Sequence, residues 1–113
     1  MSVSVLVEAP GGPVRVILAG RHGDRVSGKF VFGRLKAEDG LRVLVFDDSA
    51  EFHKDIAAAY GVEVSGGGWI EIDRKSRTVQ VGGKSTQYGR ELDRGLTVLL
   101  LERALEGFSV DSV

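Results

Sequence analysis

Two glycine-rich stretches and one histidine are the residues of this chain whose chemistry points to an anionic, phosphate-like ligand. The stretches are residues 65–69 (SGGGW) and 82–89 (GGKSTQYG), and the histidine is His53, in the sequence AEFHKDI. Glycine lets backbone N–H groups crowd together and point at one spot, which suits an anion. A histidine beside such a spot can transfer protons near neutral pH. We therefore expect phosphoryl chemistry more than any other kind.

Each of these features also has an ordinary structural interpretation. His53 follows Phe52 by about 100° around a predicted helix, so it flanks the buried stripe and could be a surface histidine without special contacts. The glycines could serve only to connect elements. However, the two stretches bracket one predicted β-hairpin and lie at the same end of it, so their backbones should be neighbours. That adjacency favours a shared pocket over two unrelated loops.

Two further motifs resemble known sites without completing them. The sequence GKST resembles the end of a nucleotide-binding P-loop, but the pattern needs glycine five residues before Gly83, where Thr78 stands. Arg21-His22-Gly23 resembles the opening motif of the histidine phosphatase superfamily, whose histidine becomes phosphorylated. No histidine after His53 supplies the second one that such a site needs. His22 remains an alternative catalytic residue, and we expect it in a solvated turn.

The elements that must position these residues follow from the apolar patterns. Alternating or continuous apolar stretches predict strands at residues 2–8, 14–20, 25–33, 41–46, 69–72, 78–81 and 108–113, with Gly28 interrupting the third. The spacing Asp48-x-x-Glu51 predicts a capping box that opens a first helix, which Gly61 ends. Phe52, Ile56 and Tyr60 would form its buried stripe.

A second helix is predicted over residues 86–106, directly after the second glycine stretch. Its apolar face would contain Leu92, Leu96, Leu99 and Leu100, and Gly95 within it suggests a close packing contact. A strand followed by a glycine turn and the start of a helix would place free backbone N–H groups where they can bind a phosphate. Residues 1–113 are thus expected to form one domain of the α/β (α+β) class, with a mixed sheet of about six strands flanked by two helices.

Composition narrows the possible functions. The formal net charge is −1 with both signs interspersed, which gives no basic footprint for nucleic acid and no polybasic membrane patch. There are no cysteines and only two histidines, so we expect neither a thiolate nor a histidine-rich metal site, and no cofactor. The longest apolar run is too short to span a bilayer, and the start of the chain does not resemble a signal peptide. These features favour a cytoplasmic protein.

Three blocks, in order and at similar spacing, resemble the janus/ocnus family of small phosphohistidine phosphatases. The first is AEFHKDI at residues 50–56, the second is the triple glycine before Trp69-Ile70, and the third is GKSTQYG at residues 83–89. The resemblance implies a small fold with a mixed sheet flanked by helices. It also implies metal-independent hydrolysis of the bond between phosphorus and a histidine nitrogen.

The resemblance assigns roles residue by residue. His53 would be the catalytic acid/base, and His53 as a phosphorylated intermediate is the competing mechanism. The remaining assigned residues would bind phosphate through side chains or backbone N–H groups: Arg15, Lys54, Gly66, Gly68, Ser85, Thr86 and Gln87. The assignment of Arg15 is based on its position in a predicted strand that contains no sharp motif.

This chain also departs from the family pattern. Trp69 stands where arginine is common, and residues 21–40 have no clear counterpart. The substrate implied is a phosphohistidine-containing protein or a small phosphoramidate, with no nucleic acid or membrane partner. The chain would act as a monomer or small homo-oligomer. The alternative functions are a non-catalytic phosphate-binding interaction module and a histidine-phosphatase-like enzyme that uses His22.

Overall fold

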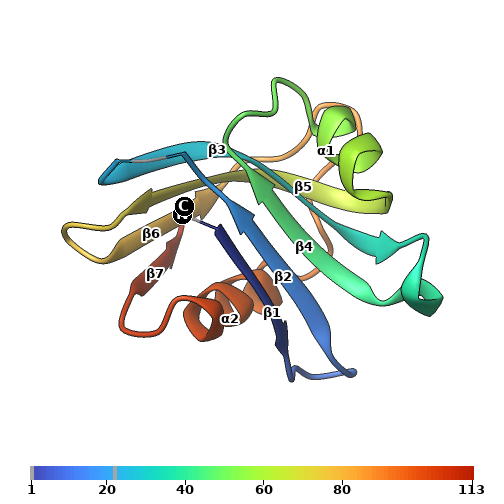
Figure 1. The fold of residues 1–113 in the computed structure, drawn as a ribbon, viewed down its shortest axis with the longest axis horizontal. Coiled ribbons are helices and arrows are strands. Elements are labelled where there is room, and N and C mark those ends of the chain that lie inside the picture. Colours follow the sequence, from blue (N-terminus) through green and yellow to red (C-terminus); the bar gives the residue numbers. More distant parts are fainter. Residues whose placement is uncertain (1, 22) are drawn as a thin grey trace.

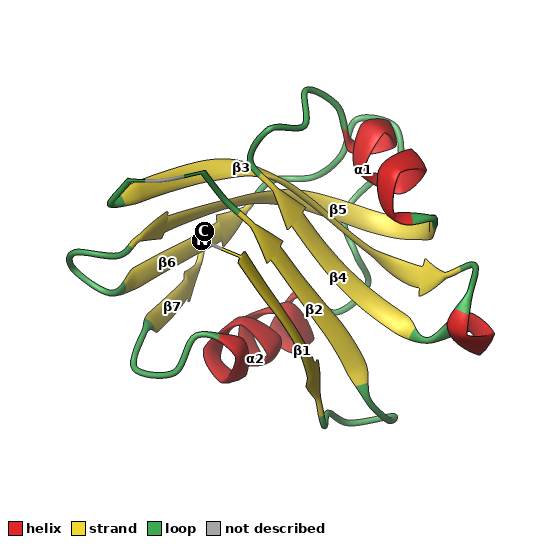
Figure 2. Ribbon diagram, viewed as in Figure 1, coloured by secondary structure: helices red, strands yellow, loops and turns green. Residues whose placement is uncertain are grey.

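The computed structural model describes residues 2–21 and 23–113, which form one seven-stranded mixed sheet and two α-helices (Figure 1 and Figure 2). The sheet order is β1-β2-β4-β3-β5-β6-β7, with β2–β4 and β6–β7 parallel and the other pairs antiparallel. The elements are β1 Ser2–Val7, β2 Val14–Ala19, β3 Arg25–Leu35, the 3-10 turn η1 Glu38–Gly40, β4 Arg42–Asp47, α1 His53–Tyr60, β5 Val62–Asp73, β6 Thr78–Gly82, α2 Arg94–Ala104 and β7 Ser109–Ser112.

Two apolar clusters on opposite faces of this sheet form the core. Successive strand residues point to opposite faces, and β3 shows this directly: Phe30 belongs to the cluster beneath α2, whereas Val31 belongs to the cluster beneath α1. Leu100 and Leu101 bring α2 into the first cluster, and Ile56 brings α1 into the second. The predicted class, a mixed sheet flanked by two helices, is confirmed, with seven strands.

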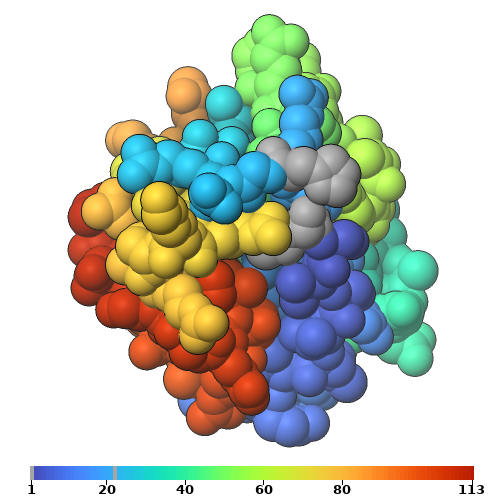
Figure 3. Space-filling model, turned by 60° about the vertical axis from the view of Figure 1, so that its left-hand side comes forward, coloured from blue at the N-terminus to red at the C-terminus, as the bar shows by residue number. Residues whose placement is uncertain are grey.

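The third strand is longer and more regular than the sequence predicted. Gly28 was expected to interrupt it, but β3 runs without a break through that position. A Cβ at Gly28 would lie 2.6 Å from the Cα of Asp48. The glycine is therefore explained by the close approach of the chain that leaves β4, and not by a break in the strand. The start of β3 lies beside the tip of the β5–β6 hairpin (light blue and yellow in Figure 3), where Arg25 pairs with Asp73.

The first glycine stretch is part of a strand and not a loop, which corrects the prediction that this strand begins at Trp69. β5 already begins at Val62, and Gly66, Gly67 and Gly68 are paired with β3. A Cβ at any of the three would collide with neighbouring backbone, at Glu91, Phe30 and Gly82 respectively. These glycines therefore allow other chain segments to pack directly on the strand.

Helix α1 begins later than its predicted capping box. Its N-cap is Phe52, and the Asp55 carboxylate accepts a hydrogen bond from the Phe52 N–H at 3.0 Å. Asp48 instead accepts a hydrogen bond from the N–H of Arg21, at 2.8 Å. Phe52 is 51% exposed, so the expectation that it is buried was wrong, whereas Ile56 is buried as predicted.

Helix α2 begins at Arg94, eight residues after the predicted start at Thr86. The N-cap is Asp93, whose carboxylate accepts from the N–H of Leu96 at 2.9 Å. Leu92 precedes the helix and is fully exposed instead of lying on the apolar face. At Gly95 a Cβ would approach only the Asp93 carboxylate, so the expected close packing contact is not present. The second glycine stretch therefore leads into a loop.

Neither helix in the described part of the chain is long and apolar enough to cross a membrane.

Candidate functional site

A cavity of about 460 Å³ lies where the start of α1 meets strands β3 and β5 and the loop after β6. His53 lines it from the first position of α1, and Gly68 and Trp69 line it from β5. The full lining is Lys29, Glu51, Phe52, His53, Lys54, Gly68, Trp69, Lys84, Ser85, Thr86 and Gln87. The two glycine-rich stretches, which we predicted to be neighbours, thus both contribute to one cavity, together with His53.

A single hydrogen bond holds the His53 ring against the sheet. Its Nε2 lies 2.9 Å from the carbonyl oxygen of Gly68, and the side chain is half-buried. A carbonyl oxygen can only accept, so Nε2 carries the hydrogen and the neutral ring keeps its lone pair on Nδ1. Within the described part of the chain Nδ1 has no hydrogen-bond partner. That nitrogen is available as a base or as a nucleophile.

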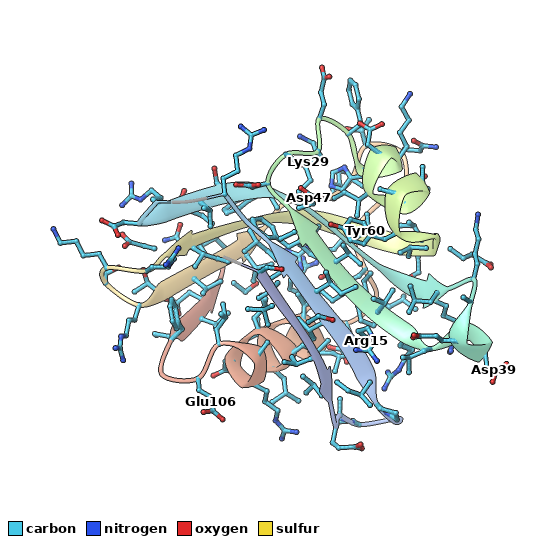
Figure 4. All side chains as sticks on the ribbon, viewed as in Figure 1. Arg15, Lys29, Asp39, Asp47, Tyr60 and Glu106 are labelled. Carbon is cyan, nitrogen blue, oxygen red and sulfur yellow. The ribbon has the colours of Figure 1, made fainter. Side chains whose placement is uncertain are left out.

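The helix that carries His53 is capped at its start and joined to the sheet at its end. At its start, Asp55 caps the N–H of Phe52. At its end, the Tyr60 hydroxyl donates to the Asp47 carboxylate at 3.0 Å, and Asp47 ends strand β4 (Figure 4). Burial and this hydrogen bond raise the pKa of Tyr60. Burial alone would raise the pKa of Asp47, but hydrogen bonds from Ser49 and Tyr60 outweigh it, so the pKa of Asp47 is lowered.

The loop that carries Ser85 is pinned to the triple glycine of β5. Ser85 N–H donates to the carbonyls of Gly67 and Gly89, both at 3.2 Å, and Gly67 N–H donates to Gly89 at 2.9 Å. The Ser85 hydroxyl accepts from the N–H of Tyr88 at 3.1 Å, and Gly89 N–H donates to the Ser85 carbonyl at 2.8 Å. This closed turn occupies the residues that had been predicted as the first turn of a helix.

A buried ion pair contacts the start of the same loop through the carbonyl oxygen of Gly83. The Arg94 guanidinium donates to Glu91 through Nε and Nη2, both at 2.8 Å, and to the carbonyl of Gly83 at 2.7 Å. Thr97 donates to the Glu91 carboxylate at 2.6 Å, and the guanidinium lies over the Phe30 ring. Each charge is thus paired and hydrogen-bonded, as a buried charge must be.

The cavity is cationic and contains free backbone donors. Lys29, Lys54 and Lys84 line it, against one acidic residue, Glu51. Lys54 also lies 5.4 Å from the ring centre of Phe52. The backbone N–H groups of Thr86 and Gln87 make no hydrogen bond with any other group that the structure describes. Ammonium groups and unpaired N–H groups are the donors that bind a phosphoryl dianion.

Six of the predicted site residues lie together at this cavity: His53, Lys54, Gly68, Ser85, Thr86 and Gln87. Gly66 does not line it, because its α-carbon packs against the backbone of Glu91. Arg15 lies in β2, near the opposite end of the sheet from Lys29 (Figure 4), with its Nε 3.7 Å from Glu38. Arg15 is thus not part of this cavity. His22 lies outside the described residues.

Sequence reasoning missed five residues of the cavity: Lys29, Glu51, Phe52, Trp69 and Lys84. Lys29 could have been found from the alternation in β3, where it occupies the same face as Val31, beneath α1. It is the cross-strand partner of Trp69. No local signal in the sequence shows that Phe52 is exposed, because that depends on where α1 begins. Among the described residues, no group of three or more histidine, cysteine, aspartate or glutamate side chains could hold a metal ion.

Comparison with known families places most of the chain in one sequence family. The sequence model of the Janus/Ocnus family (Ocnus) matches residues 24–108. The matched range includes every residue that lines the cavity. Arg15 lies outside the matched region. No curated protein matches the chain.

Proposed function

The chain belongs to the Janus/Ocnus family, and on that premise we propose that it is a phosphohistidine phosphatase that hydrolyses the bond between phosphorus and a histidine nitrogen. The observation that carries this proposal is the position of His53. Its ring is fixed by Gly68 at the wall of a cavity that is also lined by three lysines and by Thr86 and Gln87, whose backbone N–H groups have no partner among the described residues. A base and an anion site therefore share one space.

The cavity would hold the phosphoryl oxygens through charge and hydrogen bonds. Lys29, Lys54 and Lys84 would offset the negative charge, and the N–H groups of Thr86 and Gln87 would donate to the oxygens. Phosphoryl transfer depends mainly on positioning and on stabilising charge, and these donors are already in place before the reaction.

His53 would act as the general base. Its Nδ1 would take a proton from a water molecule as the water oxygen forms a bond to phosphorus. The bond between phosphorus and the substrate nitrogen breaks, and that nitrogen leaves with its electron pair and takes up the proton that His53 accepted, which returns His53 to its neutral form. The products are inorganic phosphate and the free histidine side chain. General-base catalysis contributes typically about 10²–10⁴-fold to the rate.

A second route uses the same nitrogen as a nucleophile. The Nδ1 lone pair would bond to phosphorus, the substrate nitrogen would leave, and water would then hydrolyse phosphorylated His53. Rapid quenching with substrate labelled on phosphorus separates the two routes. Label bound covalently to the protein indicates the intermediate, and label found only in phosphate and substrate indicates direct attack by water.

The test of the function is phosphate release from a histidine-phosphorylated protein, with and without a chelator. We expect release in both conditions, and we expect His53→Ala to lower kcat/KM by about 10²–10⁴-fold. The matched control is His22→Ala, which we expect to retain full activity. Full activity in His53→Ala would contradict the assignment, and loss of activity in His22→Ala alone would favour the alternative site. Tight binding of a phosphohistidine peptide without phosphate release would indicate a binding module.

A further inference from the structure

Trp69 is the one aromatic residue of β5 and lines the anion cavity. It is 38% exposed, although it lies in the middle of a twelve-residue strand. A partly exposed indole at a cavity edge offers a flat apolar face on which a planar ligand ring can pack. The mechanism proposed above gives this ring no role.

The backbone of two glycines supports the indole. A Cβ at Gly83 would lie 2.6 Å from the Cδ1 of Trp69, and a Cβ at Gly82 would lie 2.8 Å from its Cζ2. These two atoms belong to different rings of the indole, so its full length lies against residues 82 and 83. The side chain is therefore already positioned, and a ligand that packs on its exposed part has little side-chain motion to restrict.

The indole also connects the anion cavity with a second, shallower one. Trp69 and Lys29, which are cross-strand partners, line both the first cavity and a neighbouring cavity of about 380 Å³. The second cavity is completed by Ser27, Gly28, Ile70 and Glu71. There is thus more room than a phosphoryl group needs, and the extra space begins at the indole.

We propose that Trp69 is a specificity-determining residue, which stacks on the planar imidazole ring that carries the phosphoryl group. This inference rests on the proposed function and adds to it a preference among phosphoramidates. A phosphoryl group on an imidazole ring would be bound by the lysines and the backbone N–H groups while its ring packs on the indole. A phosphoryl group on the flexible amine of lysine would also be bound by the lysines and the backbone N–H groups, but it carries no ring that could stack on the indole.

The chain offers a direct readout, because Trp69 is its single tryptophan. Its fluorescence therefore comes from the site alone. The His53→Ala variant should not hydrolyse the added compounds. We would therefore titrate it with N-phosphoimidazole, phosphoramidate and inorganic phosphate. We expect phosphoimidazole to change the indole emission and to bind about 3- to 10-fold more tightly than phosphoramidate, as aromatic stacking predicts. Equal affinities with no ring-dependent change in emission would overturn the inference.

The kinetic test compares two peptides of one sequence, phosphorylated on histidine or on lysine. We expect Trp69→Leu to lower kcat/KM for the phosphohistidine peptide by about 3- to 10-fold and to leave the phospholysine peptide unchanged. Trp69→Phe, which keeps an aromatic ring, should restore most of the loss. An equal loss for both peptides, or none for either, would overturn the inference.

The two proposals fail in different ways. If the unmodified protein hydrolyses neither peptide, the proposed function is wrong, and the fluorescence comparison still decides the role of Trp69. If the unmodified protein hydrolyses both peptides and Trp69→Leu changes kcat/KM equally for both, the proposed function stands and the specificity role of Trp69 is wrong. A thermal melt of each variant confirms that it is folded before its kinetics are compared.

Discussion

Lys29 and His53 reach one cavity from different elements, and single substitutions can separate their roles. Lys29 comes from the central strand β3 and His53 from the start of α1. On the proposed function, Lys29 contacts only the charge of the substrate, whereas His53 takes part in the reaction. Lys29→Met should therefore raise KM for a phosphohistidine peptide by about tenfold and change kcat less, since a hydrogen bond to a charged group contributes about 1.5–3 kcal/mol.

The control for this prediction is Lys75→Met, at the exposed tip of the β5–β6 hairpin. It removes the same charge from the protein without touching the cavity, so KM should not change. If the two variants behave alike, the effect of Lys29 comes from the overall charge and not from the site.

Gly83 is a second residue with a testable role. Its φ of +69° disfavours other residues, and an added Cβ would also push against the indole of Trp69. Gly83→Ala should lower the free energy of unfolding by about 1–3 kcal/mol and shift the emission of Trp69. Gly12→Ala is the matched control, because Gly12 has a φ of +116° but no atom of the described residues lies within 4 Å of an added Cβ. It should be destabilising with no change in emission, and a shift in both variants would contradict the contact.

At the scale of elements, α1 is fastened to β4 by the hydrogen bond from Tyr60 to Asp47. The folded pKa of Asp47 lies below its ordinary value of 3.8, so its contribution to stability is present above that pH and is lost as the pH falls through the lowered value. The folded pKa of Tyr60 lies above its ordinary value of 10.0, so its contribution is present below that pH and is lost as the pH rises through the raised value.

Tyr60→Phe should therefore lower the free energy of unfolding by about 1 kcal/mol between about pH 5 and pH 9. The difference should shrink in acid, as Asp47 becomes protonated. Urea titrations at several pH values measure it. Tyr88→Phe is the control, since the structure gives the Tyr88 hydroxyl no hydrogen bond with any described residue. A constant difference down to pH 2 would show that the bond to Asp47 is not its cause.

The loop that carries Ser85 depends on the buried pair of Glu91 and Arg94. Arg94→Met would leave the Glu91 carboxylate buried with only the Thr97 hydroxyl as a donor. We expect a loss of about 3–5 kcal/mol, the usual cost of breaking a buried pair. Arg25→Met removes one partner of an exposed pair with Asp73 and should change stability little. Thermal or urea unfolding measures both, and similar effects in the two variants would contradict the importance of burial.

The sequence predicted the types of element well and some of their boundaries poorly, for physical reasons. Alternating or continuous apolar stretches identified β2, β4 and β6, because these patterns reflect burial directly. The start of α2 was wrong because the stretch STQYG closes on itself through Ser85 and Gly89, and the sequence does not show that contact. The triple glycine was taken for a loop because its cause is the packing of distant segments. His53 and the loop were found from local blocks, whereas Lys29 and Trp69 depend on strand pairing.

For the molecule as a whole, the site and the edges of the sheet are separate. The cavity is built on β3, β5 and their neighbours, within the region that matches the family, whereas the hairpin of β1 and β2 lies before that region. Strands β1 and β7 are the two edges of the sheet. Edge strands open more readily than central ones.

Hydrogen exchange should reveal this separation. We expect amides of β3 and β5 to exchange slowest and those of β1 and β7 fastest. The N–H groups of Thr86 and Gln87, which have no partner within the described structure, should exchange quickly and become protected when phosphate is added. Ser85 N–H, which is already bonded, is the internal control. Absence of protection at Thr86 and Gln87 would place the anion elsewhere.

The hydrogen bonds that join the Ser85 loop to Gly67 also have a consequence for the rate of binding. Because these hydrogen bonds join the loop to β5, an inner strand of the sheet, moving the loop away from the cavity would require breaking them. Entry and exit of a ligand then depend on exposed side chains such as Lys84 and Phe52, which reorient within nanoseconds. In a stopped-flow experiment that follows Trp69, the observed rate should rise linearly with ligand concentration, with no plateau from a slow lid.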